Sequence, residues 1–382
     1  MMSQHITSYG DGQTFYHTLW QFFTSTSESA LTRWKYEFTS DERIKILMRE
    51  ENYEYMLTHF CDSVALVNIP NATDVTGTCG VCRTYVGGCP SPHHDIGFAD
   101  ASKRPSPHLM LGSGLNCMPR AACVPEMWLS SLEALFTNRS KLVTKADLFL
   151  PDACNMSFVE RNADGRVLMH MMYRYGLYID YLKQHDELTR ANTTVMEIGA
   201  GWGGFAALVK NLLPTSRYIV LDIPTSLPLQ MSYMHHLGHR KIVTLQSSAT
   251  GADVKELLRS SDFDVLFILP HQIDLIPDAA VDLTVNLDSM VEMPLAAINH
   301  YMSHISRVSH SFYANNRQGR HNGWPSFRAA VDKYLIRNPS RQRPWELVKQ
   351  RRSPYVLTGR LPKWNDHVMM AGLHTELFAR RK

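Results

Sequence analysis

One glycine-rich stretch and two carboxylates have the types and spacing to bind a charged ligand that contains a ribose. The stretch VMEIGAGWGGFAALV (195–209) places Glu197 two residues before Gly199, with further glycines at 201, 203 and 204. A glycine-rich turn before a helix brings bare backbone and helix N–H groups next to a ligand. Asp222 ends the following apolar run, RYIVLD, where a carboxylate can accept hydrogen bonds from both hydroxyls of a ribose.

The details of this turn favour S-adenosylmethionine as the ligand. Glu197 would repel a pyrophosphate, but it suits ammonium and sulfonium groups. Trp202 stands where a phosphate would need room. Asp222 does not distinguish S-adenosylmethionine from NAD, because NAD sites need the same ribose contact. The lack of a GK[ST] motif excludes a P-loop. A dinucleotide site and a purely structural turn remain as alternatives.

The elements that must position these residues alternate between strand and helix. Strand-like runs such as TTVMEIG, RYIVLDI, KIVTL, DVLFILP and VDLTVNL alternate with helical stretches such as GGFAALVKNLL and LAAINHYMSHISRV. This alternation predicts an α/β fold, a parallel sheet with helices on both faces. Residues 167–184 are expected to form a helix, and WELVKQ and HTELFARRK a closing pair of strands.

The N-terminal part differs in texture. Residues 1–60 carry apolar residues at helical spacing, whereas residues 70–125 are rich in Gly, Pro, Ser and Cys and predict a long irregular connection. We expect residues 1–140 to form a helical and loop-rich region that recognises the acceptor or supports homo-oligomers. Residues 145–382 are expected to form the catalytic domain.

In the regular part, the sequence resembles class I S-adenosylmethionine-dependent methyltransferases, and more narrowly the family of sugar O-methyltransferases. The matching stretches are VMEIGAGWGGFAALV, RYIVLDIPTSLPLQMSYM, VLFILPHQIDLIPDAAVDLTVNLDSMVEMP and SFYANNR. The resemblance covers roughly residues 145–382. It implies a Rossmann-like sheet of seven strands, mostly parallel with one antiparallel edge strand, and a cofactor over the carboxyl ends of the central strands. The cofactor-binding residues that it implies are Glu197, Gly199, Gly201, Trp202, Asp222, Ile223, Pro270, Asn286 and Arg174.

Methyl transfer to a hydroxyl is an in-line displacement that needs alignment and a base for the hydroxyl proton. The candidates are Asp288, Glu292 and His271. Asp288 is expected at a strand end, and His271 is expected to end the neighbouring strand. Asp288 and Glu292 are four residues apart and share a face if a helical turn follows the strand. One could then raise the pKa of the other, or both could hold a divalent cation that acidifies the hydroxyl. The alternative for Glu292 is a carboxylate that only stabilises a helix N-terminus through the helix dipole. The alternative for His271 is a polar residue that only ends a strand.

Polar residues in SFYANNR are candidates for contacts to the acceptor. They are expected to follow the next strand, and they suit a hydroxyl-rich or acidic acceptor, although an ordinary polar loop is the alternative. These residues are Tyr313, Asn315, Asn316 and Arg317.

The seven cysteines all lie in the first 154 residues, and their odd number favours free thiols in a reducing, cytoplasmic setting. CGVC (Cys79 and Cys82), followed by Cys89, His93 and His94, has spacing compatible with structural zinc. An ordinary loop with free thiols is the alternative.

Composition and charge narrow the function classes. The net charge of +3 over 382 residues makes nucleic acid an unlikely partner, although the tail is basic. The polar N-terminus and the lack of an apolar run of about 18 residues predict no secretory signal and no membrane span. The rival functions are methylation of RNA or another non-sugar acceptor, and a non-catalytic S-adenosylmethionine-binding scaffold.

Overall fold

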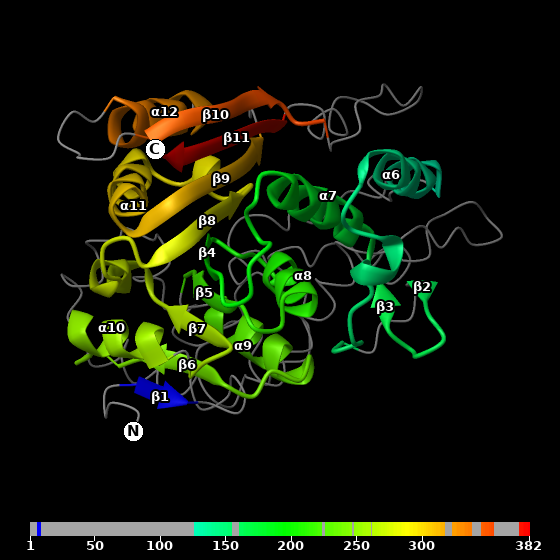
Figure 1. Ribbon diagram of the computed structural model, residues 1–382, viewed down its shortest axis with the longest axis horizontal. Coiled ribbons are helices and arrows are strands. Elements are labelled where there is room, and N and C mark those ends of the chain that lie inside the picture. The colour runs from blue at the N-terminus through cyan, green and yellow to red at the C-terminus, as the bar shows by residue number, and fades with distance from the viewer. Residues whose placement is uncertain are drawn as a thin grey trace, which may run out of the picture.

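The computed structural model describes residues 6–8, 126–154, 160–223, 226–246, 248–260, 262–317, 323–337, 345–354 and 374–382. Within them, a nine-stranded sheet in the order β1-β6-β7-β5-β4-β8-β9-β11-β10 runs through the molecule (Figure 1). Its strands are β1 (Ile6–Ser8), β4 (Thr194–Ile198), β5 (Arg217–Leu221), β6 (Ile242–Leu245), β7 (Val265–Ile268), β8 (Val281–Leu287), β9 (Ser309–Arg317), β10 (Trp345–Arg352) and β11 (His374–Arg381). A separate small sheet pairs β2 (Glu160–Arg161) with β3 (Val167–Leu168).

The pairing directions confirm the predicted mostly parallel α/β fold. The six central strands, β6, β7, β5, β4, β8 and β9, pair in parallel with one another. The outer strands β1, β11 and β10 pair antiparallel with their neighbours. The expected number of seven strands was wrong, because the sheet of the described residues has nine, with β1 at one edge and β10 at the other. The antiparallel strand β11 also lies between β9 and β10 rather than at the edge, since β10 pairs along its outer side.

Helices cover both faces of the sheet (Figure 1). They are α6 (Glu126–Arg139), α7 (His170–Gln184), α8 (Gly204–Leu212), α9 (Leu227–His236), α10 (Gly251–Ser260), α11 (Leu295–Val308) and α12 (Gly323–Val331), with the shorter η5 (Lys145–Leu148), η6 (Pro270–Leu275), η7 (Met290–Glu292) and η8 (Asp332–Ile336). Because strand side chains alternate, Val195 of β4 joins the core under α6 to α9, and Met196 joins the core under α10 to α12.

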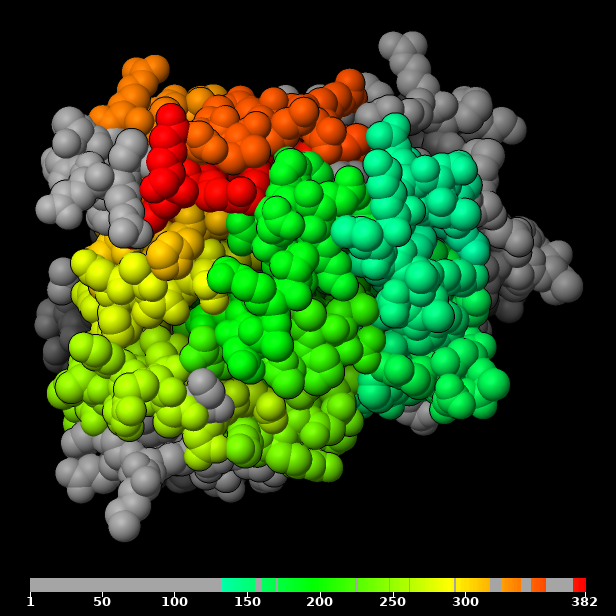
Figure 2. All heavy atoms as spheres, viewed as in Figure 1, coloured from blue at the N-terminus to red at the C-terminus, as the bar shows by residue number. Residues whose placement is uncertain are grey.

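The helix α6 joins the same core as the rest of the described chain. Phe136 is buried there, and its ring lies 5.6 Å from the ring of Tyr173 on α7. In the space-filling view, the green segment with α7 and α8 forms the front of the molecule beside α6, with β10 and β11 above (Figure 2). The last residues of the predicted N-terminal region therefore pack on the sheet domain, while residues 9–125 lie outside the described part.

Candidate functional site

The turn between β4 and α8 is shaped by glycines. Gly199, Gly201 and Gly203 have φ angles of 71°, 60° and 83°, a conformation that side-chain-bearing residues rarely adopt. A Cβ on Gly199 would lie only 2.2 Å from Ser289 Oγ, whereas a Cβ on Gly201 would meet nothing within 4 Å. The turn therefore packs tightly at Gly199 and presents bare, exposed backbone at Gly201, just before the N-terminus of α8.

Trp202 points away from this open side, into the core. Its ring packs against those of Tyr175, at 6.2 Å, and Tyr233, at 5.7 Å. A Cβ on Gly204 would lie 2.0 Å from the same indole, so this glycine makes room for the ring. The structure thus places Trp202 as a support behind the turn, although the sequence predicted it as a cofactor contact.

Glu197 is a buried carboxylate at the end of β4. Its side chain shares the face of Val195, is 2% exposed, and accepts a hydrogen bond of 2.8 Å from Tyr218 Oη. Burial, opposed by the hydrogen bond from Tyr218 and assisted by the neighbouring Asp222, raises the pKa of Glu197 to about 8. The site therefore holds a carboxyl group that a nearby cation would convert to its charged form.

Asp222 follows β5 directly, as the sequence predicted. Its carboxylate accepts hydrogen bonds from Gln230 Nε2, at 2.8 Å, and from the backbone N–H of Ile223, at 2.7 Å. Burial raises the pKa of Asp222 to about 6, although these hydrogen bonds lower it. Gln230 Nε2 also donates to Gly201 O at 2.5 Å, so one amide joins the carboxylate to the open turn.

Gln230 was missed by sequence reasoning, although a signal was present. Every residue from Leu227 to Met234 of α9 is buried, so a glutamine in this apolar run needed a polar partner. That partner is the strand end that carries Asp222.

A second cluster gathers around Asp288, just after β8. His374 Nε2 lies 2.7 Å from Asp288 Oδ1, and Arg174 Nη2 lies 3.5 Å from Asp288 Oδ2. Arg174 also donates to Tyr178 Oη at 2.9 Å. The Asp288 side chain is 32% exposed, and that of His374 only 4%. The cluster therefore presents a carboxylate to solvent with a histidine behind it and an arginine beside it.

Sequence reasoning also missed His374. It begins β11, and it reaches Asp288 because β11 pairs with β9, with His374 opposite Arg317. No local motif marks this residue, so only the order of the strands could have identified it.

Asn286 ties the two clusters together. The side chain is buried, and Nδ2 donates to Ile198 O at 2.8 Å and to Ser289 Oγ at 2.5 Å. Its Oδ1 accepts from Met290 N and from Asn316 Nδ2, at 3.2 and 2.9 Å. Asn286 therefore holds the turn after β8 against the end of β4.

His271 lies far from Asp288, although the sequence predicted that their strands are neighbours. That prediction was wrong, because β5 and β4 lie between β7 and β8. Three strand spacings correspond to about 14 Å. Pro270 and His271 begin η6, where Pro270 is buried, and burial lowers the pKa of His271.

The predicted acceptor residues lie inside β9 rather than in a loop after it. Tyr313 donates to Glu376 Oε1 at 2.9 Å, Asn315 donates to Ser353 Oγ at 2.8 Å, and Asn316 is bonded to Asn286. All three side chains are buried, since β8 and β11 flank the strand. The loop expectation was wrong because β9 runs on to Arg317. The side chains of Arg317 and Glu292 lie outside the described residues.

The cysteine predictions have a mixed outcome. Cys79, Cys82 and Cys89, with the predicted zinc site, lie outside the described residues. Cys154 is disulfide-bonded, so the expectation of free thiols is wrong at this position. An odd number of cysteines excludes complete pairing, but it does not exclude individual disulfides, which persist mainly in oxidising compartments. Among the described residues, no helix is long and apolar enough to cross a membrane.

Comparisons with known proteins found matches among solved structures. No protein-family model and no curated protein matches the sequence. A solved protein of Thermoplasma acidophilum is 11% identical over 55% of this chain and 89% of its own, with a TM-score of 0.35. Mitomycin 7-O-methyltransferase is 12% identical over 56% of this chain and 57% of its own, with a TM-score of 0.30. Magnesium protoporphyrin IX methyltransferase of Synechocystis, solved with bound S-adenosylmethionine, is 11% identical over 56% and 81%, with a TM-score of 0.33.

These values identify neither a family nor an activity for this chain. The resemblance to sugar O-methyltransferases therefore stays a prediction.

Proposed function

We propose that this chain transfers a methyl group from S-adenosylmethionine to a hydroxyl group of a sugar, in a glycan or a nucleotide sugar. The observation that carries the proposal is the order of three neighbouring strand ends. Asp222 follows β5, the open glycine turn follows β4, and Asp288 follows β8, and these strands are adjacent in the sheet. Asp222 and Asp288 are thus two strand spacings apart, about 10 Å, on either side of the turn.

The residues of the turn fit an elongated cationic cofactor. Asp222 can accept hydrogen bonds from the ribose hydroxyls, because its carboxylate stands at a strand end next to Gly201. Glu197 can balance the positive charge, since its buried carboxyl group accepts its hydrogen bond from the neutral Tyr218 hydroxyl. The space around Gly201 leaves room for the ligand against the backbone. When bound, S-adenosylmethionine supplies a methyl group activated by a positively charged sulfur.

The cluster around Asp288 supplies the base in this proposal. The sugar hydroxyl donates a hydrogen bond to the exposed Asp288 carboxylate, and the Asp288–His374 pair takes its proton while the oxygen forms its bond to the methyl carbon. The carbon–sulfur bond breaks, and the electron pair remains on the sulfur. Arg174 orients Asp288 from the other side. Because two basic side chains already flank Asp288, we favour this role over the alternative of a divalent cation held by Asp288 and Glu292.

The sugar acceptor rests on the resemblance over Asn286–Met293 and SFYANNR, and on the need of a weakly acidic hydroxyl for a base. The test is incubation of the full-length protein with methyl-labelled S-adenosylmethionine and separate panels of nucleotide sugars, glycans and RNA. We expect label on a sugar oxygen, and at least a 100-fold slower rate for Asp288→Asn, within the range of general-base catalysis. Label on RNA alone would contradict the sugar acceptor, and cofactor binding without transfer to any panel would contradict the catalytic role.

A further inference from the structure

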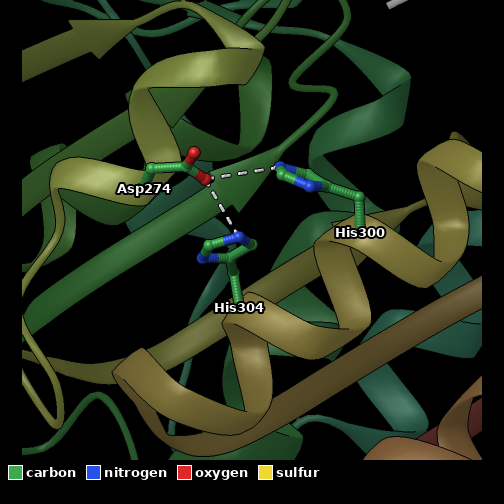
Figure 3. A group of neighbouring side chains, drawn as sticks. All are labelled: Asp274, His300 and His304. Carbon is green, nitrogen blue, oxygen red and sulfur yellow. Dashed lines mark ion pairs between the residues drawn. The ribbon is translucent and has the colours of Figure 1, made fainter.

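Three side chains of metal-ligating type meet away from the strand ends described above. His300 and His304 lie one helical turn apart on α11, and Asp274 lies on η6, with all three pointing toward one another (Figure 3). Asp274 Oδ1 is 3.0 Å from His304 Nε2 and 3.7 Å from His300 Nε2. One ligand atom from each residue lies within 4.8 Å of the others.

These distances match the ligand shell of a small transition-metal ion. Zinc bonds to nitrogen and oxygen are about 2.0–2.2 Å long, so tetrahedral ligand atoms stand roughly 3.3 Å apart. The two measured separations lie on either side of this value. Two histidines at positions i and i+4 on one helix face also supply two of the zinc ligands in the H-E-x-x-H motif. Two imidazoles and a carboxylate would leave a fourth position for water.

The surroundings allow an ion to enter. The Asp274 side chain is 52% exposed, and the two histidines are half-buried. Each imidazole binds a metal in its neutral form, through the lone pair of one ring nitrogen.

Arg307 is a cation that contacts the cluster. Its Nη2 lies 3.0 Å from His304 Nδ1, while Nη1 donates to Asp278 Oδ1 at 2.8 Å and to Ile276 O at 2.5 Å. A metal on Nε2 would place the ring proton on Nδ1, so Arg307 Nη2 must turn aside. Nη2 also donates to the backbone oxygens of Ile273, at 3.1 Å, and Asp274, at 3.4 Å, so Arg307 keeps backbone partners when it shifts away from the ring.

We propose that Asp274, His300 and His304 bind one Zn²⁺ ion that joins η6 to α11. The ion would fix two segments next to the strand ends, because η6 begins directly after β7 and α11 follows the turn that carries Asp288. Its role is structural, and it is independent of the proposed methyl transfer.

The test is titration of the chelator-treated, full-length protein with ZnCl₂, followed by metal analysis and thermal unfolding. We expect the wild type to bind one more Zn²⁺ per chain than His300→Ala/His304→Ala, and its Tm to rise with Zn²⁺ where that of the double variant does not. Asp274→Asn, which keeps the side-chain shape, should weaken binding. His236→Ala, at an exposed histidine of α9, should match the wild type.

Cobalt distinguishes this site from the cysteines. Co²⁺ on imidazole and carboxylate ligands gives visible bands without the thiolate charge-transfer bands that cysteine ligands would add. We expect the wild type to show the visible bands of Co²⁺ on imidazole and carboxylate ligands. These bands should disappear in His300→Ala/His304→Ala. Equal zinc stoichiometry and an unchanged cobalt spectrum in wild type and double variant would overturn the proposal.

Discussion

The cofactor half and the catalytic half of the candidate site are held by different kinds of contact. The cofactor half consists of Glu197, the glycine turn 199–203 and Asp222, which lie within 26 residues, 197–222. The proposed catalytic half consists of Arg174, Asp288 and His374, which are spread over 201 residues of chain, 174–374. Backbone conformation and the side-chain amide of Gln230 shape the cofactor half. Ion pairs between α7, the end of β8 and β11 shape the second.

This difference separates two tasks. A backbone turn fixes the place of a ligand with little dependence on distant packing, because three glycines set its path. The proposed reacting carboxylate, Asp288, depends on the register of β9 and β11, which brings His374 to it. Changes in one half should therefore affect binding, and changes in the other should affect the rate.

The largest expected effect lies in the catalytic half. Asp288→Asn should lower kcat by at least 100-fold, about 3 kcal/mol, because the amide cannot take the hydroxyl proton. Binding of S-adenosylhomocysteine should remain within a few-fold of the wild type. Steady-state kinetics and calorimetry measure both, with the exposed Asp262→Asn as control. Equal losses of binding and rate would show that the halves are not separate.

Within the cofactor half, two glycines should respond differently to the same substitution. Both Gly199→Ala and Gly201→Ala place a side chain at positive φ, which costs about 1–2 kcal/mol. Gly199→Ala adds the collision with Ser289, so urea unfolding should show a loss of about 2–3 kcal/mol or more. Gly201→Ala should instead weaken S-adenosylhomocysteine binding more than stability. Equal destabilisation by the two changes would contradict the described packing.

The link between the halves can be broken at Asn286. Asn286→Ala leaves Met290 N and Asn316 Nδ2 without their acceptor, which should cost about 2 kcal/mol in unfolding free energy. It should also reduce both binding and rate. Asn316→Ala removes only one of these bonds and should cost less. A variant at Asn286 that lost rate but kept full stability would argue against its linking role.

The last prediction concerns pH. The folded chain raises the pKa of Glu197 from 4.5 to about 8, so it holds a proton that the unfolded chain releases. This contribution makes stability fall as pH rises from about 4.5 to 8. Asp222 acts in the same direction up to about pH 6, so the comparison with a Glu197 variant is made from pH 6 to 8. The Tm of the wild type should fall more steeply there than that of Glu197→Gln, and parallel curves would refute the assignment.

Sequence periodicity predicted much of the sheet, because buried parallel strands are apolar runs that alternate with helices. It also predicted that the last two strands pair, as β10 and β11 do. It did not predict α10, although Thr250 and Asp253 form an N-terminal cap there. Strand neighbours were beyond its reach, since periodicity marks strands and not their order. His271 was therefore grouped with Asp288 wrongly.

The candidate site divides along the same line. Glu197 and Asp222 were found because a short motif and a strand end carry them. His374 was not found, because its partner is 86 residues away in sequence, from 288 to 374. Tyr313, Asn315 and Asn316 were misplaced by the assumption that polar residues end a strand. Here they donate hydrogen bonds to Glu376, Ser353 and Asn286, respectively, from inside the sheet.

The most direct measurement is calorimetric titration of the full-length protein with S-adenosylhomocysteine, with NAD as the competing ligand and with Asp222→Ala and Asp262→Ala as paired variants. The account predicts micromolar binding of S-adenosylhomocysteine by the wild type and Asp262→Ala. It predicts a loss of about 100-fold in Asp222→Ala, consistent with two charge-assisted hydrogen bonds. Binding of NAD instead, or equal binding by both variants, would contradict the assignment of the glycine turn and the methyl transfer built on it.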